Sequence, residues 1–247
     1  MKCKLCLLAK PLLNKSHIIP DFMYQELFDK DHKIYRLKTS NTDKYSKVPT
    51  GEYDQNILCA ECDNVRIGQF EHYASKVLYG GKLAVSEFPT FINQVNPHGM
   101  KYTYCQNINY KKFKLFLLSI LWRASISKRD FFSSVSLGSH EEIIRQMIKN
   151  EDPKEPDDYP CFMVTYRDDE PIASQIVVQP KRIKEKGFTI YAFIIGGVVY
   201  TFYVSKHNVP EYIFDGVINK SNEMKISHVP KGSRKKLLMN SSGFKIY

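Results

Sequence analysis

The chain has 247 residues, of which 43% are hydrophobic and 13% aromatic, enough to build a packed core and to exclude an intrinsically disordered protein. It contains no run of about 18 apolar residues. Its basic start, MKCKLCLLAK, lacks the apolar stretch and the cleavage site of a signal peptide. We therefore expect a cytoplasmic protein without a membrane span. A formal net charge of +10 favours a polyanionic partner such as nucleic acid, without identifying one.

The first 83 residues are predicted to form short elements. Residues 21–28 (DFMYQELF) have an acidic residue after Pro20 and apolar residues at helical spacing, which indicates a short helix. Further along, the pattern predicts a strand over 32–38, a polar loop over 39–50 and a helix over 62–78. The apolar positions assigned to this last helix are Val65, Phe70, Tyr73, Ala74 and Val77.

The middle of the chain is predicted to be largely helical. Residues 84–108 are turn-rich and indicate a connection with one or two strands. The apolar segment 110–127 is too long for a typical strand, so it predicts a buried helix with Trp122 in the core. A second helix is expected over 139–149, opened by a capping box at Ser139 and Glu142. The acidic, proline-bearing residues 150–160 predict a loop.

The last third of the chain is rich in β-forming residues. Residues 161–229 contain the short runs CFMVTY, SQIVVQ and FTIYAFIIGGVVYTFYV, and the Gly196-Gly197 pair inside the last run is a hairpin signal. We expect an antiparallel sheet with the helices packed against one face. A basic surface tail or terminal strand is expected over 231–247.

Two C-x-x-C pairs, Cys3 with Cys6 and Cys59 with Cys62, are the strongest chemical signal. Each pair presents two thiolates from one tight turn, and together they complete the tetrahedral four-ligand shell that Zn²⁺ prefers. Because no open position would remain, we expect this zinc to be structural. The 52 residues between Cys6 and Cys59 leave room for a hairpin, and the second pair opens directly into a helix, the order seen in treble-clef zinc sites.

The stretches CKLC, SHIIP and QNILCAECDN follow one another along the chain. Their order resembles that of the HNH (ββα-metal) endonucleases, in which a strand with the catalytic histidine follows the first knuckle and an asparagine precedes the second. The resemblance covers about residues 3–70, under a third of the chain. It implies a metal-dependent endonuclease that hydrolyses phosphodiester bonds of nucleic acid, DNA foremost, in a setting such as bacterial restriction or anti-phage defence.

Carried over by position, the resemblance implies that His17 is the general base that takes a proton from the attacking water. Asn56 would orient this histidine, and Asp63, with Asn64 as a substitute, would bind a catalytic Mg²⁺ or Mn²⁺. Each assignment has a structural alternative. His17 would then bond a backbone carbonyl at the knuckle, Asn56 would be a turn residue, and Asp63 would favour the dipole of its helix.

Two positions depart from the family's pattern. Ser16 stands where many members have Asp, and Asp63 stands where they have His or Asn. Since Asp63 alone would hold a cation weakly, further side chains are candidate helpers: Asp21, Glu61, Glu71 and His72. The alternative function is therefore a non-catalytic, zinc-organised nucleic-acid-binding or regulatory protein.

The expected fold class is α+β, with an N-terminal zinc-bound treble-clef or ββα-metal unit, central helices and a C-terminal antiparallel β-rich region. We expect a zinc-binding domain over 1–83 and a helical plus antiparallel β domain over 84–247, which is open to a protein partner. Cys105 and Cys161 stand alone in the sequence and are expected to be buried apolar residues rather than ligands.

Overall fold

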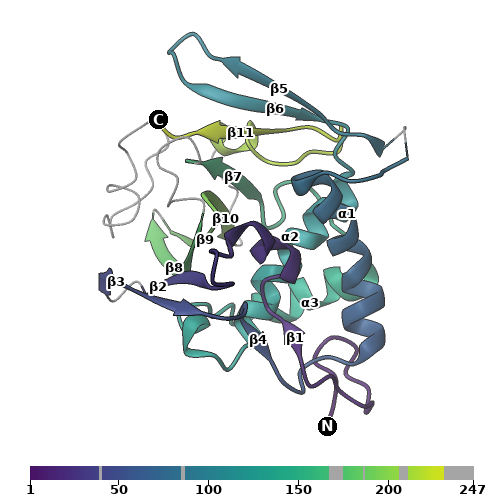
Figure 1. Cartoon of the computed structure of the whole chain (residues 1–247). Coiled ribbons are helices and arrows are strands. Elements are labelled where there is room, and N and C mark those ends of the chain that lie inside the picture. Colours follow the sequence, from purple (N-terminus) through teal and green to yellow (C-terminus); the bar gives the residue numbers. More distant parts are fainter. Residues whose placement is uncertain (39–40, 85–86, 167–174, 186, 206–210, 231–247) are drawn as a thin grey trace.

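The computed structural model describes residues 1–38, 41–84, 87–166, 175–185, 187–205 and 211–230. Its largest element is a nine-stranded sheet, and three helices lie together on one side of it (Figure 1). The sheet strands are Ile34–Lys38 (β2), Asn41–Val48 (β3), Thr90–Val95 (β5), Lys101–Gln106 (β6), Cys161–Thr165 (β7), Ile176–Glu185 (β8), Phe188–Ile195 (β9), Val198–Val204 (β10) and Met224–His228 (β11). Their order is β3-β2-β8-β9-β10-β7-β11-β6-β5, and only the pairs β2–β8 and β7–β11 are parallel.

A second, two-stranded sheet pairs Ser16–His17 (β1) with Tyr53–Asp54 (β4), which places His17 opposite Tyr53. The helices are Asp21–Leu27 (η1, 3₁₀), Glu61–Ile67 (η2, π), Gly68–Tyr79 (α1), Tyr110–Ile126 (α2), Asp130–Phe132 (η4, 3₁₀), His140–Asn150 (α3) and Glu211–Phe214 (α4). The element η2 continues directly into α1. In the part of the chain that the structure describes, no helix has both the length and the apolar character needed to cross a bilayer.

Most of the predicted elements are confirmed, but the loop over 39–50 and the capping box at Ser139 are not. The polar segment expected to be a loop over 39–50 contains β3, because β2 offers it an antiparallel ladder. Its polar composition is that of an edge strand. The capping box at Ser139 does not form, since this residue has helical angles and its side chain makes no cap hydrogen bond. A cap does occur at α2, where the Asn109 side chain accepts from the Lys112 amide at 2.9 Å.

The helix expected over 62–78 is present, but its first turns are wound as a π-helix. This winding changes which residues face inward, because a π-helix has more residues per turn than an α-helix. Val65, assigned to the apolar side, is 66% exposed, whereas Cys62 and Ile67 are buried. Along α1 the expected positions Phe70, Tyr73, Ala74 and Val77 are all buried, as the 3.6-residue repeat requires.

The Gly196-Gly197 hairpin is confirmed. Both glycines have positive φ, +58° and +77°, as the two-residue turn between β9 and β10 requires. The strands on either side are buried on both faces. They therefore lie in the middle of the sheet and read as continuous apolar runs. The basic segment over 231–247 lies outside the described residues.

One hydrophobic core extends between the helices and the sheet. It contains Cys3 and Leu5 at the start of the chain, Trp122 on α2, and Met224 on β11. The strands β2 and β3, which come from the first 83 residues, extend the sheet formed by the C-terminal strands. Both the core and the sheet therefore cross the expected boundary at residue 83. The isolated Cys105 and Cys161 are buried, as expected.

Candidate functional site

The four cysteines predicted to bind zinc come together. The Sγ atoms of Cys3, Cys6, Cys59 and Cys62 all lie within 4.8 Å of one another, and the four thiols are free of disulfides. Zinc–sulfur bonds of about 2.3 Å in a tetrahedron place the sulfurs about 3.8 Å apart, so the cluster fits the ion. Burial foremost, and then hydrogen bonding to Cys59, raises the pKa of the Cys62 thiol. A zinc ion would hold these thiols as thiolates.

Main-chain contacts hold the two knuckles in position. The Cys3 amide donates to the Leu8 carbonyl at 3.0 Å, and Leu7, with φ of +63°, closes this turn. The Cys59 amide donates to Cys3 Sγ at 3.4 Å, a contact that stabilises a thiolate. From α3, the guanidinium of Arg145 donates to the buried Leu5 carbonyl, so the central helices help to hold the first knuckle.

His17 lies at the junction of the small sheet with the helices. Its Nε2 is buried without a hydrogen-bond partner and lies 3.6 Å from Asp21 Oδ1, while a quarter of the side chain is exposed. Burial lowers the pKa of His17, and the Asp21 carboxylate opposes this shift. The imidazole is therefore neutral near pH 7, the form that a general base requires.

Asp63 lies on the neighbouring η2 helix, against the same group of side chains. Burial raises the pKa of Asp63, the Arg123 cation lowers it, and the Glu71 carboxylate raises it again. The buried Ser16 hydroxyl lies close enough to lower this pKa as well, although the two groups form no hydrogen bond of normal geometry. The structure therefore brings Ser16, Asp63 and Glu71 into one environment with His17.

Arg123, on α2, lies at the centre of this group and was given no role from the sequence. Its side chain is 1% exposed. Nη1 donates to the His17 carbonyl at 2.8 Å, Nη2 lies 2.6 Å from Glu71 Oε1, and Nε donates to the Ser119 carbonyl at 3.2 Å. The sequence signal was a single arginine inside the apolar run FLLSILWRAS. An interior arginine on such a helix requires partners, because an unpaired buried charge is costly.

Several other predicted residues lie apart from this group. Asn56 is exposed in a turn with φ of +57°, and its main-chain amide donates to the Leu13 carbonyl at 2.9 Å. Within the described chain, no hydrogen bond joins its side chain to His17. Asn64 and His72 are exposed, and Glu61 pairs with Lys10 at the surface.

The acidic residues near His17 do not form a compact three-ligand site. Among the described residues, the cysteine cluster is the one group of three or more His, Cys, Asp or Glu side chains close enough to share an ion. A cation near Asp63 would therefore have few protein ligands and would keep several waters, which is the usual state of Mg²⁺. Comparison with family models, curated proteins and solved structures found no match to this chain.

Proposed function

We propose that the chain is a metal-dependent endonuclease of the HNH type that hydrolyses phosphodiester bonds of nucleic acid, with DNA as the first substrate to test. The observation that carries the proposal is the placement of His17. This histidine lies on a two-stranded antiparallel ladder, beside the helix that begins at the second cysteine pair, with Asp63 and Arg123 in the same environment. The pair of strands followed by a helix supports the family resemblance, although η1, β2 and β3 lie between β1 and β4 in the chain.

In the proposed reaction, the neutral His17 imidazole accepts a proton from the attacking water. Asp63 would hold a Mg²⁺ or Mn²⁺ ion, which when bound stabilises negative charge on the scissile phosphate and the leaving oxygen. Arg123 fixes the main chain of His17 and pairs with Glu71. The four-cysteine zinc site would have no part in the chemistry and would hold the first knuckle against the helix.

The test is cleavage of plasmid DNA and of RNA in Mg²⁺, in Mn²⁺ and in a buffer without divalent ions, for the wild-type chain and for His17→Ala. We expect divalent-dependent cleavage by the wild type and none by the variant, with zinc content and thermal stability retained. His72→Ala is the matched control, because His72 is exposed on the following helix and should not affect cleavage. Cleavage by His17→Ala at the wild-type rate would refute the assignment.

A non-catalytic, zinc-organised nucleic-acid-binding protein is the second candidate. Two observations favour it: Asn56 lies away from His17, and the acids near His17 do not form a compact cation site. This candidate predicts salt-sensitive DNA binding with no cleavage in either divalent ion. The same assay, combined with a binding measurement, separates the two functions.

A further inference from the structure

Two cations lie beside an aromatic ring on the His17 face of the small sheet. Tyr53 is the register partner of His17, and their rings are 6.4 Å apart, edge to face. Lys15 lies immediately before β1, and its ammonium contacts the ring of Tyr53. The Lys15 ammonium lies 5.0 Å, and the Arg129 guanidinium 5.1 Å, from the centroid of the Tyr53 ring. The two cations are therefore at most about 10 Å apart, comparable to the Debye length of physiological salt.

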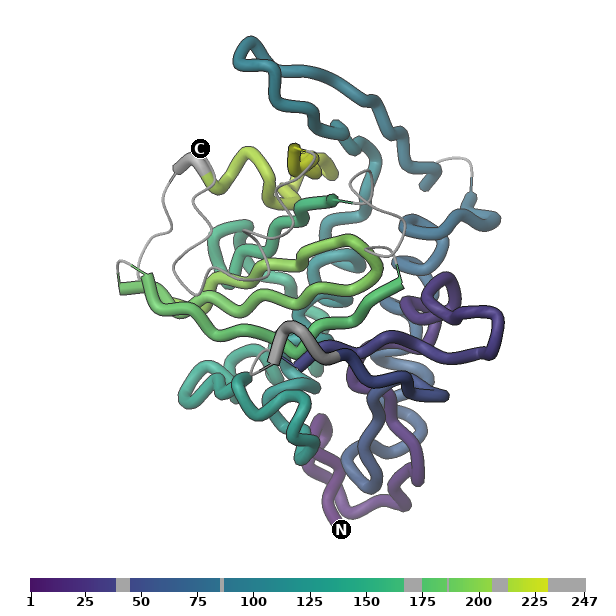
Figure 2. The backbone as a smooth tube through the Cα atoms, turned by 60° about the vertical axis from the view of Figure 1, so that its left-hand side comes forward, coloured from purple at the N-terminus to yellow at the C-terminus, as the bar shows by residue number. Residues whose placement is uncertain are grey.

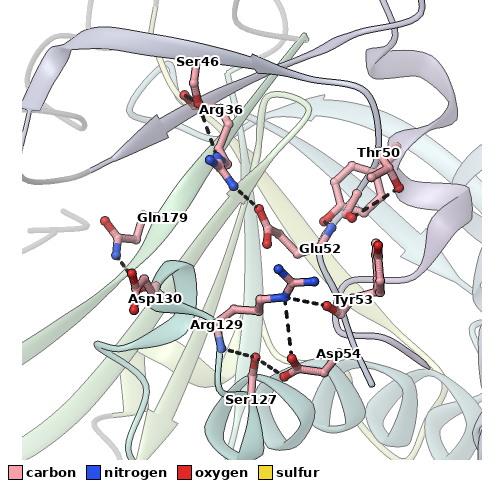
Figure 3. Close-up of polar contacts among 12 residues, drawn as sticks. Arg36, Ser46, Thr50, Glu52, Tyr53, Asp54, Ser127, Arg129, Asp130 and Gln179 are labelled. Carbon is pink, nitrogen blue, oxygen red and sulfur yellow. Dashed lines mark hydrogen bonds and ion pairs between the residues drawn. The ribbon is translucent and has the colours of Figure 1, made fainter. Parts of the chain in front are cut away.

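The position of Arg129 is fixed by the loop that follows α2 (Figure 3). Its Nε donates to the Tyr53 carbonyl at 2.8 Å and lies 3.6 Å from Asp54 Oδ1. Asp54 is nearly buried and also accepts from the Ser127 hydroxyl at 2.6 Å and from the Lys128 amide at 2.9 Å. These contacts bind the loop to β4 and so fix the main chain that carries Arg129.

The charged ends of these side chains are available to a ligand. Arg129 is 45% exposed, and within the described chain its two terminal nitrogens make no hydrogen bond. Lys15 is also exposed, and its ammonium makes no ion pair with a described residue. Lys128, next to Arg129, adds a third exposed cation. Asp54 offsets part of this charge, but its carboxylate is nearly buried and already engaged by the loop.

We propose that Lys15, Tyr53 and Arg129 form a phosphate clamp that binds the nucleic-acid backbone beside His17. This inference rests on the proposed function, because it places the backbone next to the reacting phosphate. The planar fork of Arg129 matches a phosphate group, and Lys15 acts as a point charge. Cation–π attraction to the Tyr53 ring restricts the motion of each cation, which reduces the cost of ordering them when the ligand binds.

The experiment measures binding of a fluorescein-labelled duplex DNA to the zinc-loaded chain, without Mg²⁺ or Mn²⁺, over a range of salt concentrations. For Lys15→Ala/Arg129→Ala we expect weaker binding and a plot of log K against log salt that is shallower by about 1.8, the contribution of two phosphate contacts. Lys15→Ala alone should reduce the slope by about 0.9. This single variant also tests the clamp if the loss of Arg129 disturbs the loop.

The matched control is Lys82→Ala/Lys101→Ala, which removes the same charge from two exposed sites. Lys101 is the first residue of β6, and Lys82 lies between α1 and β5. The β5–β6 hairpin lies at the end of the molecule opposite the N-terminus (Figure 2). If both double variants weaken DNA binding equally, binding depends on diffuse charge and the clamp is refuted. The clamp is also refuted if the wild type does not bind DNA. If the wild type binds through the clamp but never cleaves, the clamp holds and the nuclease proposal fails. If the wild type cleaves DNA and Lys15→Ala/Arg129→Ala cleaves it with the same KM, the clamp proposal fails instead.

Discussion

Arg123 Nη1 donates a hydrogen bond of 2.8 Å to the main-chain carbonyl of His17, a residue 106 positions earlier in the chain. The same guanidinium pairs with Glu71 on α1, so three elements meet at one buried side chain. The main chain of the candidate general base is therefore held by a helix of the central region and not only by the zinc unit. This contact makes the N-terminal site dependent on the rest of the fold.

Removal of the Arg123 charge should destabilise the protein. Arg123→Met leaves Glu71 and the His17 carbonyl without their partner, and loss of one member of a buried ion pair costs about 3 kcal/mol. Arg123→Lys keeps the charge but not the fork, so an intermediate loss is expected. Urea unfolding measures the free energy of unfolding of both variants, and Glu71→Gln completes a double-mutant cycle with Arg123→Met. A change below about 0.5 kcal/mol in Arg123→Met, the range of ordinary surface substitutions, would contradict this account.

The cleavage rate should depend on pH through His17. Because burial lowers the pKa of His17, the imidazole remains neutral at more acidic pH than a free histidine, whose pKa is about 6.5. The acidic limb of the kcat/KM–pH profile, which reports the free enzyme, should therefore lie below pH 6.5. Asp21→Asn removes a carboxylate that raises this pKa and should shift the limb to lower pH, whereas Lys15→Ala should shift it upward. Shifts in the same direction for both variants would exclude His17 as the titrating base.

Zinc should be present at one ion per chain and should depend on the four cysteines. Cys59→Ser removes one ligand of the cluster and should abolish stoichiometric zinc and lower the thermal midpoint. Cys105→Ala is the control, because Cys105 is equally buried but lies outside the cluster. Elemental analysis of the purified proteins measures the metal. Full zinc occupancy in Cys59→Ser would show that the ion binds elsewhere.

Lys114, on the buried α2 helix, should make stability depend on pH. Its ammonium donates to the Tyr110 hydroxyl at 3.0 Å, and burial lowers its pKa to about 8 from 10.5. Between these values the unfolded chain binds more protons than the folded chain, so the destabilisation caused by burying the charged Lys114 decreases as pH rises through this window. Relative to Lys114→Met, wild-type stability should rise by about 1–2 kcal/mol from pH 8 to 9.5.

The matched variant for this measurement is Lys112→Met, on the same helix. Lys112 is partly exposed and pairs with Glu87 at 2.8 Å. Its removal should not change the pH dependence of the unfolding free energy in the same window. If Lys112→Met and Lys114→Met give the same pH profile, the lowered pKa of Lys114 is not the cause of the effect.

Local sequence patterns predicted the elements that are determined by residues close together in the chain. The apolar run of α2, the Gly196-Gly197 turn and the two C-x-x-C pairs each depend on residues close together in the chain. Val65 and Ser139 show where this reasoning failed. The π-turns of η2 changed the inward face, and the cap expected at Ser139 is absent.

The sequence by itself determined that Cys3, Cys6, Cys59 and Cys62 are suited to one zinc ion, because ligand type and knuckle spacing are enough to specify that chemistry. Tertiary structure alone decided that Arg123 reaches His17 and that Arg129 lies beside Tyr53. Each of these contacts joins residues far apart in the chain, through packing of α2 and its loop against the small sheet. Periodicity reports which face of an element is buried, but it does not report which distant element covers that face.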